Sequence, residues 1–441
     1  MKKKNFSVIG KPLEKIDALA KCAGATVYAD DLHLPQMLYA KLLRSPHAHA
    51  RIRAIHTERA ERLTGVYAVI TGKDLPVRFG IMPSTQDEEA LALDKVRYVG
   101  DPVAAVVAAT EALADRALAA IDVEYEVLKP VLSIEEALAS AEASERIHSW
   151  NRRANIQKVV ALEFGDVQTA FAQAEHIFEG AFFYQGNTHL PIEQYCAVAA
   201  YAPDGKLTVW SSTQTPHYVH RALAKVLELP EKRIRVIATP VGGGFGGKSD
   251  PFSHEICAAK LSMITGRPVK ITLTREETFY VHRGRHPVKM WIKTGVKSDG
   301  SLQAMHFKSF LDGGGYSSYG LATVYYTGAL QTVTYRLPAY KFDGVRVFTN
   351  KPPCGPKRGH GTPQPRFAIE IQLDEIAEKL GIDPIQLRLR QLVEPNTVTV
   401  NGLRVGTTGL RECIERVAER ARWTDKHRKL PFGHGVGFAA S

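Results

Sequence analysis

The chain has 441 residues, of which 44% are hydrophobic and 23% charged, and it carries a formal net charge of +11. This length allows two or three domains with substantial cores, and there is no run of about 18 apolar residues that would span a membrane. Because no dense cluster of Lys, Arg and aromatic residues accompanies the positive charge, a nucleic-acid-binding protein is disfavoured. The charge indicates either a solvated basic surface or an anionic substrate or cofactor.

The five cysteines exclude several kinds of site. They are far apart and include no C-x-x-C pair, which excludes a disulfide framework, an iron–sulfur cluster and a zinc site within this chain. An iron–sulfur centre, if the reaction needs one, has to come from another chain. The basic N-terminus is not followed by an apolar segment, so it is not typical of a signal peptide, and we expect a cytoplasmic protein.

The first third of the chain is predicted to contain one compact domain. Residues 1–18 form a lead-in, and residues 19–127 form a domain that alternates strands and helical segments, which favours an α/β arrangement. Its expected elements are strands at 36–44, 65–71 and within 95–107, and an alanine-rich helix at 111–121. Residues 128–155 are predicted to connect it to a second domain.

A larger domain is predicted over residues 156–432. Its expected strands include 207–213, 269–274 and 290–295. Apolar residues at three–four spacing predict an amphipathic helix over 368–392, interrupted at Gly381 and Asp383. Residues 433–441 read as the beginning of a strand, so we expect the fold to be completed by another polypeptide.

The most distinctive stretch is the glycine loop Pro240–Ser249, in which five glycines surround Phe245. A β-branched segment precedes it, and a helix over 250–261 with Pro251 in its first turn is predicted to follow. Glycines in this position let backbone N–H groups approach an anion or a cofactor edge, because no Cβ intervenes. Gly242–Ser249 also fits the G-x-x-x-x-G-K-S pattern of a P-loop, so the loop alone is compatible with either a phosphate or a cofactor.

Five segments, in the right order, resemble signatures of the xanthine dehydrogenase/aldehyde oxidase family. They are residues 44–52, 99–104, 211–214, 242–248 and 354–361. The resemblance covers nearly the whole chain. It implies an α+β fold in which an α/β-hammerhead domain is followed by the first molybdopterin-binding domain, and it makes a P-loop nucleotide hydrolase the weaker alternative.

The resemblance also implies a molybdenum site in which no side chain ligates the metal. The metal would be held through the dithiolene of a molybdopterin dinucleotide, in the cytosine form that bacterial relatives typically use. Aligned N–H donors suit such a centre, because they stabilise a change of charge without reorganising. The cofactor-binding residues implied by the resemblance are Gln214, Gly244, Phe245, Gly246, Arg358 and Gly359.

Several positions bear on the substrate. Ser249 stands where purine-oxidising members carry a glutamate, and Tyr326 stands where they carry an arginine. Cys354 is four residues before Arg358, whereas carbon-monoxide dehydrogenases have a cysteine three residues before it, so a copper-bridged site is disfavoured. Three further segments resemble the molybdenum subunit of 4-hydroxybenzoyl-CoA reductases, namely residues 77–83, 326–330 and 349–362.

This closer resemblance implies reductive dehydroxylation of an aromatic CoA thioester, with Tyr326 and His360 as candidate proton donors. The alternative within the family is hydroxylation of an N-heterocycle or an aldehyde. Because the family's catalytic glutamate belongs to a second molybdenum domain, we expect this chain to be the N-terminal half of a split subunit and to be inactive alone. Its expected partners are a chain with that second domain, an iron–sulfur subunit and a flavin (FAD) subunit.

Overall fold

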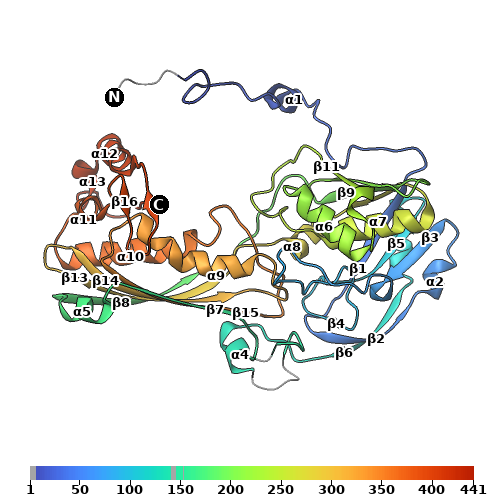
Figure 1. The fold of residues 1–441 in the computed structure, drawn as a ribbon, viewed down its shortest axis with the longest axis horizontal. Helices are drawn as coiled ribbons and strands as arrows, with labels where there is room; N and C mark the ends of the chain where they lie inside the picture. The colour runs from blue at the N-terminus through green and yellow to red at the C-terminus, as the bar shows by residue number, and fades with distance from the viewer. Residues whose placement is uncertain (1–5, 141–145, 152) are drawn as a thin grey trace.

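The computed structural model describes residues 6–140, 146–151 and 153–441, and it contains two large sheets at opposite ends of the molecule (Figure 1). Parts of the predicted lead-in and connector, residues 1–5, 141–145 and 152, lie outside the described residues. One sheet has seven strands, which are, in order across it, β11 (Ile234–Ala238), β10 (Leu207–Ser211), β9 (Cys196–Tyr201), β12 (Val269–Thr272), β1 (Leu38–Arg44), β5 (Pro102–Ala108) and β3 (Val66–Thr71).

The seven-stranded sheet combines strands from both sides of the predicted connector. β1 pairs in parallel with β12, with Leu38 opposite Val269. All residues of β5 are buried, because β1 and β3 flank it and both α3 (Glu111–Leu118) and α7 (Ser253–Thr265) pack against it. The two predicted segments 19–127 and 156–432 therefore share one sheet and one core.

A smaller three-stranded sheet completes the N-terminal part of the chain. It has the order β4 (Lys95–Val96), β2 (Ala50–His56) and β6 (Asp122–Val127), and α2 (Glu58–Glu61) follows β2 along the chain. The connector contains the short helix α4 (Ile134–Ala139), which begins at a capping box between Ser133 and Glu136. Residues 6–22, which include α1 (Ala18–Cys22), lie away from both sheets (Figure 1). α1 begins at the last residue of the predicted lead-in and continues into the predicted domain 19–127.

The second large sheet has five strands, and two helices cover most of one face (Figure 1). The short helices α5 (Val167–Ala172) and α4 contact β14 and β15 on part of the other face. α9 (Gly320–Ala329) packs on β15 and β7, and α10 (Pro363–Lys379) packs on β8 and β13. Inward side chains such as Ile292, Phe307 and Phe342 are fully buried there, as the period-two alternation of a half-covered sheet requires. Its strands are, in order, β7 (Ile156–Phe164), β15 (Ala339–Val347), β14 (Leu302–Asp312), β13 (Val288–Val296) and β8 (His176–Tyr184).

The predicted interruption of the late amphipathic helix is confirmed. α10 ends at Lys379, Gly381 adopts a left-handed φ of 67°, and α11 (Pro384–Gln391) begins one turn later. Asp383 caps α11 by accepting hydrogen bonds from the backbone N–H groups of Ile385 and Gln386, which satisfies donors that have no partner inside the helix.

Two local predictions are wrong. α7 begins at Ser253, because the Glu255 side chain accepts from the Phe252 N–H, so Pro251 lies before the helix and not in its first turn. In the described C-terminal residues, α12 (Leu410–Ala421) and α13 (Trp423–Lys426) are followed by turns and extended chain, and 433–441 form no strand. Within the described part of the chain, no helix is long and apolar enough to cross a membrane.

Candidate cofactor site

Three loops that are distant in sequence meet at one place. The glycine loop follows β11, Gln214 follows β10 just before α6 (Pro216–Val226), and residues 354–361 precede α10. The Gly246 N–H donates to Oε1 of Gln214 at 3.0 Å, and the Arg358 N–H donates to the Phe245 carbonyl at 2.9 Å. The structure thus brings together Gln214, Phe245, Gly246 and Arg358, as the resemblance implied.

Close approach explains why the loop needs glycine. A Cβ on Gly244 would lie 2.5 Å from Oε1 of Gln214. A Cβ on Gly246 would lie 2.6 Å from the Pro356 carbonyl oxygen, and Gly246 has a φ of 95° that favours glycine in any case. Phe245 itself adopts a φ of 53°, and the residue is 48% exposed. The loop is therefore held in close contact with Gln214 and Pro356 on one side, and its turn at Phe245 is exposed on the other.

The donors left over point to an anionic or electron-rich ligand. Oε1 of Gln214 accepts from the N–H groups of Gly246 and Lys248, so the side-chain NH₂ group is directed away from the loop. Within the described residues, the Phe245 N–H has no protein acceptor and the exposed Arg358 side chain has no carboxylate partner. This donor set, next to a glycine cradle that a Cβ would fill, fits a molybdopterin edge.

Tyr326 and His360 form a second part of the site, on α9 and on the loop before α10. Their rings meet edge to face with centroids 5.8 Å apart, and Tyr319 lies 5.3 Å from His360. Nε2 of His360 pairs with the Thr323 hydroxyl. Burial, together with nearby Arg285, lowers the pKa of His360 to about 4. A neutral imidazole at pH 7 is poorly suited to the proton-donor role expected of it, whereas it can serve as an aromatic wall and hydrogen-bond partner.

This pKa makes a testable contribution to stability. Unfolded His360 titrates near its ordinary pKa of 6.5 and folded His360 near 4, so the unfolded state binds more protons between these values. The free energy of unfolding therefore falls as pH falls through this window, by about 2 kcal/mol at pH 5 for this one group. We expect the free energy of unfolding of His360→Gln, measured in urea, to fall by about 2 kcal/mol less between pH 7 and pH 5 than that of the wild type.

An exposed histidine supplies a control of opposite sign. The hydrogen bond that His56 donates to the Glu124 carboxylate raises the pKa of His56. His56 therefore stabilises the fold at low pH, and its contribution disappears as pH rises. In His56→Gln, the free energy of unfolding should therefore decrease more between pH 7 and pH 5 than it does in the wild type. Equal pH dependence of wild type and His360→Gln would contradict a neutral, buried His360.

The P-loop interpretation does not fit this geometry. Lys248 is 1% exposed in its side chain, and its Nζ lies 2.6 Å from Oε2 of Glu193. In a P-loop that lysine reaches the phosphates, and a helix begins at the loop. Here the ammonium group points away from the exposed turn, and α7 begins only at Ser253.

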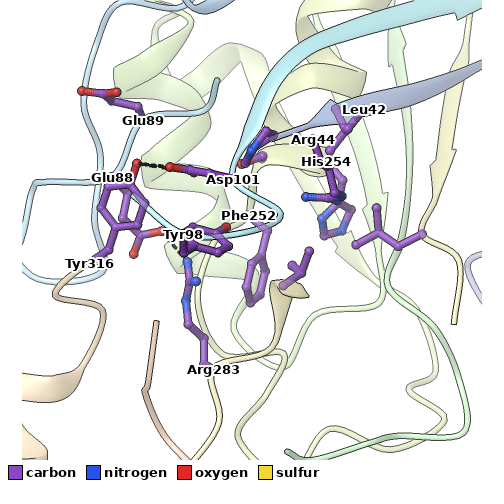
Figure 2. Close-up of a pocket in the computed structure, with 14 residues that line it drawn as sticks. Leu42, Arg44, Glu88, Glu89, Tyr98, Asp101, Phe252, His254, Arg283 and Tyr316 are labelled. Atoms are coloured by element: carbon purple, nitrogen blue, oxygen red, sulfur yellow. Dashed lines mark hydrogen bonds and ion pairs between the residues drawn. The ribbon is translucent and has the colours of Figure 1, made fainter. Parts of the chain in front are cut away.

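A buried cluster of charged side chains, several of which Figure 2 shows, reaches the end of the glycine loop through Asp250. Arg283 pairs with Glu88 from the N-terminal part of the chain and with Asp250, at 3.1 Å, from the end of the loop. The Tyr316 hydroxyl donates to Asp101 at 3.2 Å. The cavity among these side chains measures about 20 Å³, which is room for one water molecule and not for a substrate. This cluster is a structural support of the site.

Sequence reasoning missed the residues that support the loops. Arg285 donates to the Arg358 carbonyl at 2.5 Å, and Nε2 of His189 pairs with the Pro356 carbonyl at 2.7 Å. Arg283 and Glu193, described above, were missed as well. Three cationic or imidazole side chains at 283, 285 and 286, between a short helix and a strand, were the one available signal. Cys354 is buried, and burial raises the pKa of its thiol to about 12, so it is not a reactive thiolate.

Two protein-family models match most of the chain. The model of the molybdopterin cofactor-binding domain matches residues 147–392, and that of the aldehyde oxidase and xanthine dehydrogenase a/b hammerhead domain matches residues 23–129. Over 421 residues the chain is 39% identical to the nicotinate dehydrogenase large molybdopterin subunit of Eubacterium barkeri, covering 95% of this chain and 97% of that protein. It is 36% identical to a xanthine dehydrogenase molybdenum-binding subunit of Escherichia coli, covering 96% and 58% respectively.

Solved structures give the same result. The aldehyde oxidoreductase of Desulfovibrio gigas superposes with a TM-score of 0.88 at 30% identity, over 95% of this chain and 47% of that one. Quinoline 2-oxidoreductase of Pseudomonas putida 86 superposes with a TM-score of 0.85 at 29% identity, over 93% of this chain and 54% of that one. The chain thus spans about half the length of these relatives and nearly all of the first relative above. The expected α+β fold, a hammerhead domain followed by a molybdopterin-binding domain, is confirmed.

Proposed function

Because the chain belongs to the xanthine dehydrogenase and aldehyde oxidase family of molybdenum-dependent oxidoreductases, we propose that it is the large molybdopterin-binding subunit of an enzyme that hydroxylates an aromatic N-heterocycle. The observation that carries the proposal is its identity with nearly the full length of a nicotinate dehydrogenase large molybdopterin subunit. Ser249, in place of the glutamate of purine-oxidising members, agrees with a substrate other than a purine.

The three loops supply the groups that such a cofactor needs. The cofactor, when bound, supplies two-electron redox chemistry at molybdenum. The NH₂ group of Gln214 and the N–H of Phe245 would donate to its edge, and Arg358 would balance its negative charge. These donors are held by the contacts at Gly246 and Lys248, so they need not reorganise when the charge of the cofactor changes.

The substrate would enter along an aromatic wall. The rings of Tyr319 and Tyr326 both pack against His360, and Tyr325 is 46% exposed beside Tyr326. Aromatic rings pack well against such edge-to-face surfaces. A neutral His360 adds no charge that would repel a heterocycle protonated on nitrogen.

The general base is assigned to a partner chain. The carboxylates next to the glycine loop are Glu193 and Asp250, and both are engaged in buried ion pairs, with Lys248 and Arg283. Neither is placed to accept a proton from water or substrate. The proposal takes its remaining parts from the family resemblance: a chain that carries the catalytic glutamate, iron–sulfur and flavin subunits, and the cytosine form of the cofactor. It also keeps the cytoplasmic location expected from the sequence.

Reductive dehydroxylation of a 4-hydroxybenzoyl-CoA-like thioester is the second candidate, and one observation favours it. Part of the segment at residues 77–83 lines a cavity of about 230 Å³ against α6. Arg221 and Lys225 line the same cavity, and within the described residues neither has a carboxylate partner. Two such cations would suit the phosphates of CoA.

The test is to purify the complex through a tag on this chain and to measure molybdenum, iron and pterin nucleotide per chain. Turnover of nicotinate or quinoline with an electron acceptor, without turnover of 4-hydroxybenzoyl-CoA under reducing conditions, supports the first candidate. The reverse pattern, weakened by Arg221→Gln with Lys225→Gln, supports the second. A complex without molybdenum, or turnover by the isolated chain, contradicts the proposal.

A further inference from the structure

The lysine of the G-x-x-x-x-G-K motif has a role that the cofactor site does not yet explain. Its ammonium group is buried beneath the loop, where it donates to the Gln194 carbonyl at 3.2 Å and lies 5.6 Å from the centroid of the Tyr195 ring. Within the described residues, Lys248 is the one cation within ion-pair distance of Glu193. Burial lowers the pKa of Lys248, and the hydrogen bond with Glu193 opposes that shift.

Glu193 connects the two ends of the glycine loop. The same oxygen, Oε2, that pairs with Lys248 also accepts a hydrogen bond from the Gly242 N–H at 2.8 Å. Gly242 is the first glycine of the loop, and Lys248 directly follows its last. A Cβ on Gly242 would lie 2.6 Å from Cβ of Glu193, so the carboxylate stem fits closely under the loop. At the far end, the Tyr195 hydroxyl donates to the Gly247 carbonyl at 3.0 Å.

We propose that Glu193 and Lys248 are positioning residues that close the glycine loop into a single geometry. They thereby hold two donors for the cofactor: the Phe245 N–H, and the Gln214 side chain that the Gly246 N–H orients. The role of these donors in holding the cofactor rests on the proposed function, whereas the closing of the loop does not. A segment with five glycines has an unusually large conformational entropy in the absence of restraints. One carboxylate oxygen that binds both ends removes most of that freedom at once.

The pair is more than a generic stabilising contact because its two parts are separable. The carboxylate acts on the loop as an acceptor for Gly242, and the lysine serves to neutralise that buried carboxylate. A neutral acceptor at 193 would need no lysine. Removing one charge of a buried pair is harmful, whereas replacing both charges by neutral groups of similar volume is often tolerated.

This separation gives the experiment. Glu193→Gln with Lys248→Met removes both charges and keeps an acceptor for the Gly242 N–H. Glu193→Leu with Lys248→Met removes both charges and the acceptor. We expect both double variants to fold, with Tm values within a few degrees of each other. The Gln variant should retain molybdenum at the wild-type level, and the Leu variant should lose pterin at least about tenfold faster, because its loop is no longer closed.

A second readout does not depend on the cofactor. In the cofactor-free protein, hydrogen exchange of a peptide covering the loop should be at least about tenfold faster in the Leu variant than in the Gln variant. Arg388→Met is the control, because Arg388 is a fully buried cation in α11, 2.7 Å from Glu370 and outside the loop contacts. It should lower Tm without changing either loop readout.

Two outcomes overturn the inference. Equal hydrogen exchange in the two double variants would show that the acceptor at 193 does not close the loop. Equal exchange rates in Arg388→Met and the Leu variant, both above wild type, would show that loop opening merely follows global stability. A wild-type complex that lacks molybdenum would contradict the proposed function, and the exchange comparison would still decide whether Glu193 and Lys248 close the loop.

Discussion

Gly246→Ala is expected to leave the chain unable to retain molybdopterin, with molybdenum content falling roughly 100-fold under competition with free cofactor. The added Cβ would meet the Pro356 carbonyl at 2.6 Å, and the φ of 95° is strained for alanine. To relieve this clash, the loop has to move away from residues 354–361. That movement breaks the hydrogen bond from the Arg358 N–H to the Phe245 carbonyl. Strain and lost contacts together amount to about 3 kcal/mol, which corresponds to two orders of magnitude in affinity.

Gly402→Ala is the matched control for that substitution. Gly402 has a φ of 80°, and a Cβ there would meet nothing within 4 Å. It lies in the turn between β16 (Thr397–Val398) and β17 (Arg404–Val405). The backbone strain alone should lower the free energy of unfolding by about 1 kcal/mol and leave the molybdenum content unchanged. Full cofactor retention in Gly246→Ala would contradict the close contact with Pro356.

Arg283→Met is expected to have the largest effect on stability, a loss of about 3–5 kcal/mol in urea unfolding at pH 8. The substitution leaves two buried carboxylates, Glu88 and Asp250, without their cation, and an uncompensated buried charge is costly. Burial raises the pKa of the Glu88 carboxyl group above its ordinary value. Because the carboxyl group of Glu88 can then take up a proton, the loss should be smaller at pH 5 than at pH 8.

An exposed ion pair calibrates this result. Lys206 lies 2.8 Å from Asp204, and both side chains are more than half exposed. Lys206→Ala should change the free energy of unfolding by less than about 0.5 kcal/mol. A loss that small for Arg283→Met would mean that the cluster in Figure 2 is hydrated in solution, and that it does not hold the N-terminal part of the chain against the glycine loop.

Local features of the sequence indicated where the three loops of the candidate site lie. The glycine loop was recognisable because close backbone approach restricts its residue types, whereas Gln214 was implied only by the family resemblance of residues 211–214. Arg358 was recognisable from the signature around it. The break between α10 and α11 followed from Gly381 and Asp383, since a left-handed residue and a side-chain cap act within one turn of the chain. The family and the fold class followed from the order of such segments.

Long-range packing settled what these local patterns left open. One seven-stranded sheet joins β1 to β12 across more than 200 residues, and the alternation of side chains along a strand does not identify its neighbour. The loop pattern alone was compatible with Lys248 as a phosphate ligand, and the family resemblance made that the weaker alternative. The contact of Lys248 with Glu193, 55 residues away, disfavours it further. The resemblance suggested His360 as a proton donor, whereas its burial near Arg285 in the folded chain lowers its pKa and keeps it neutral. The burial of a side chain and the charged residues around it are set by the fold of the whole chain. The pKa of His360 and the partner of Lys248 therefore could not be predicted from the short segments that contain them.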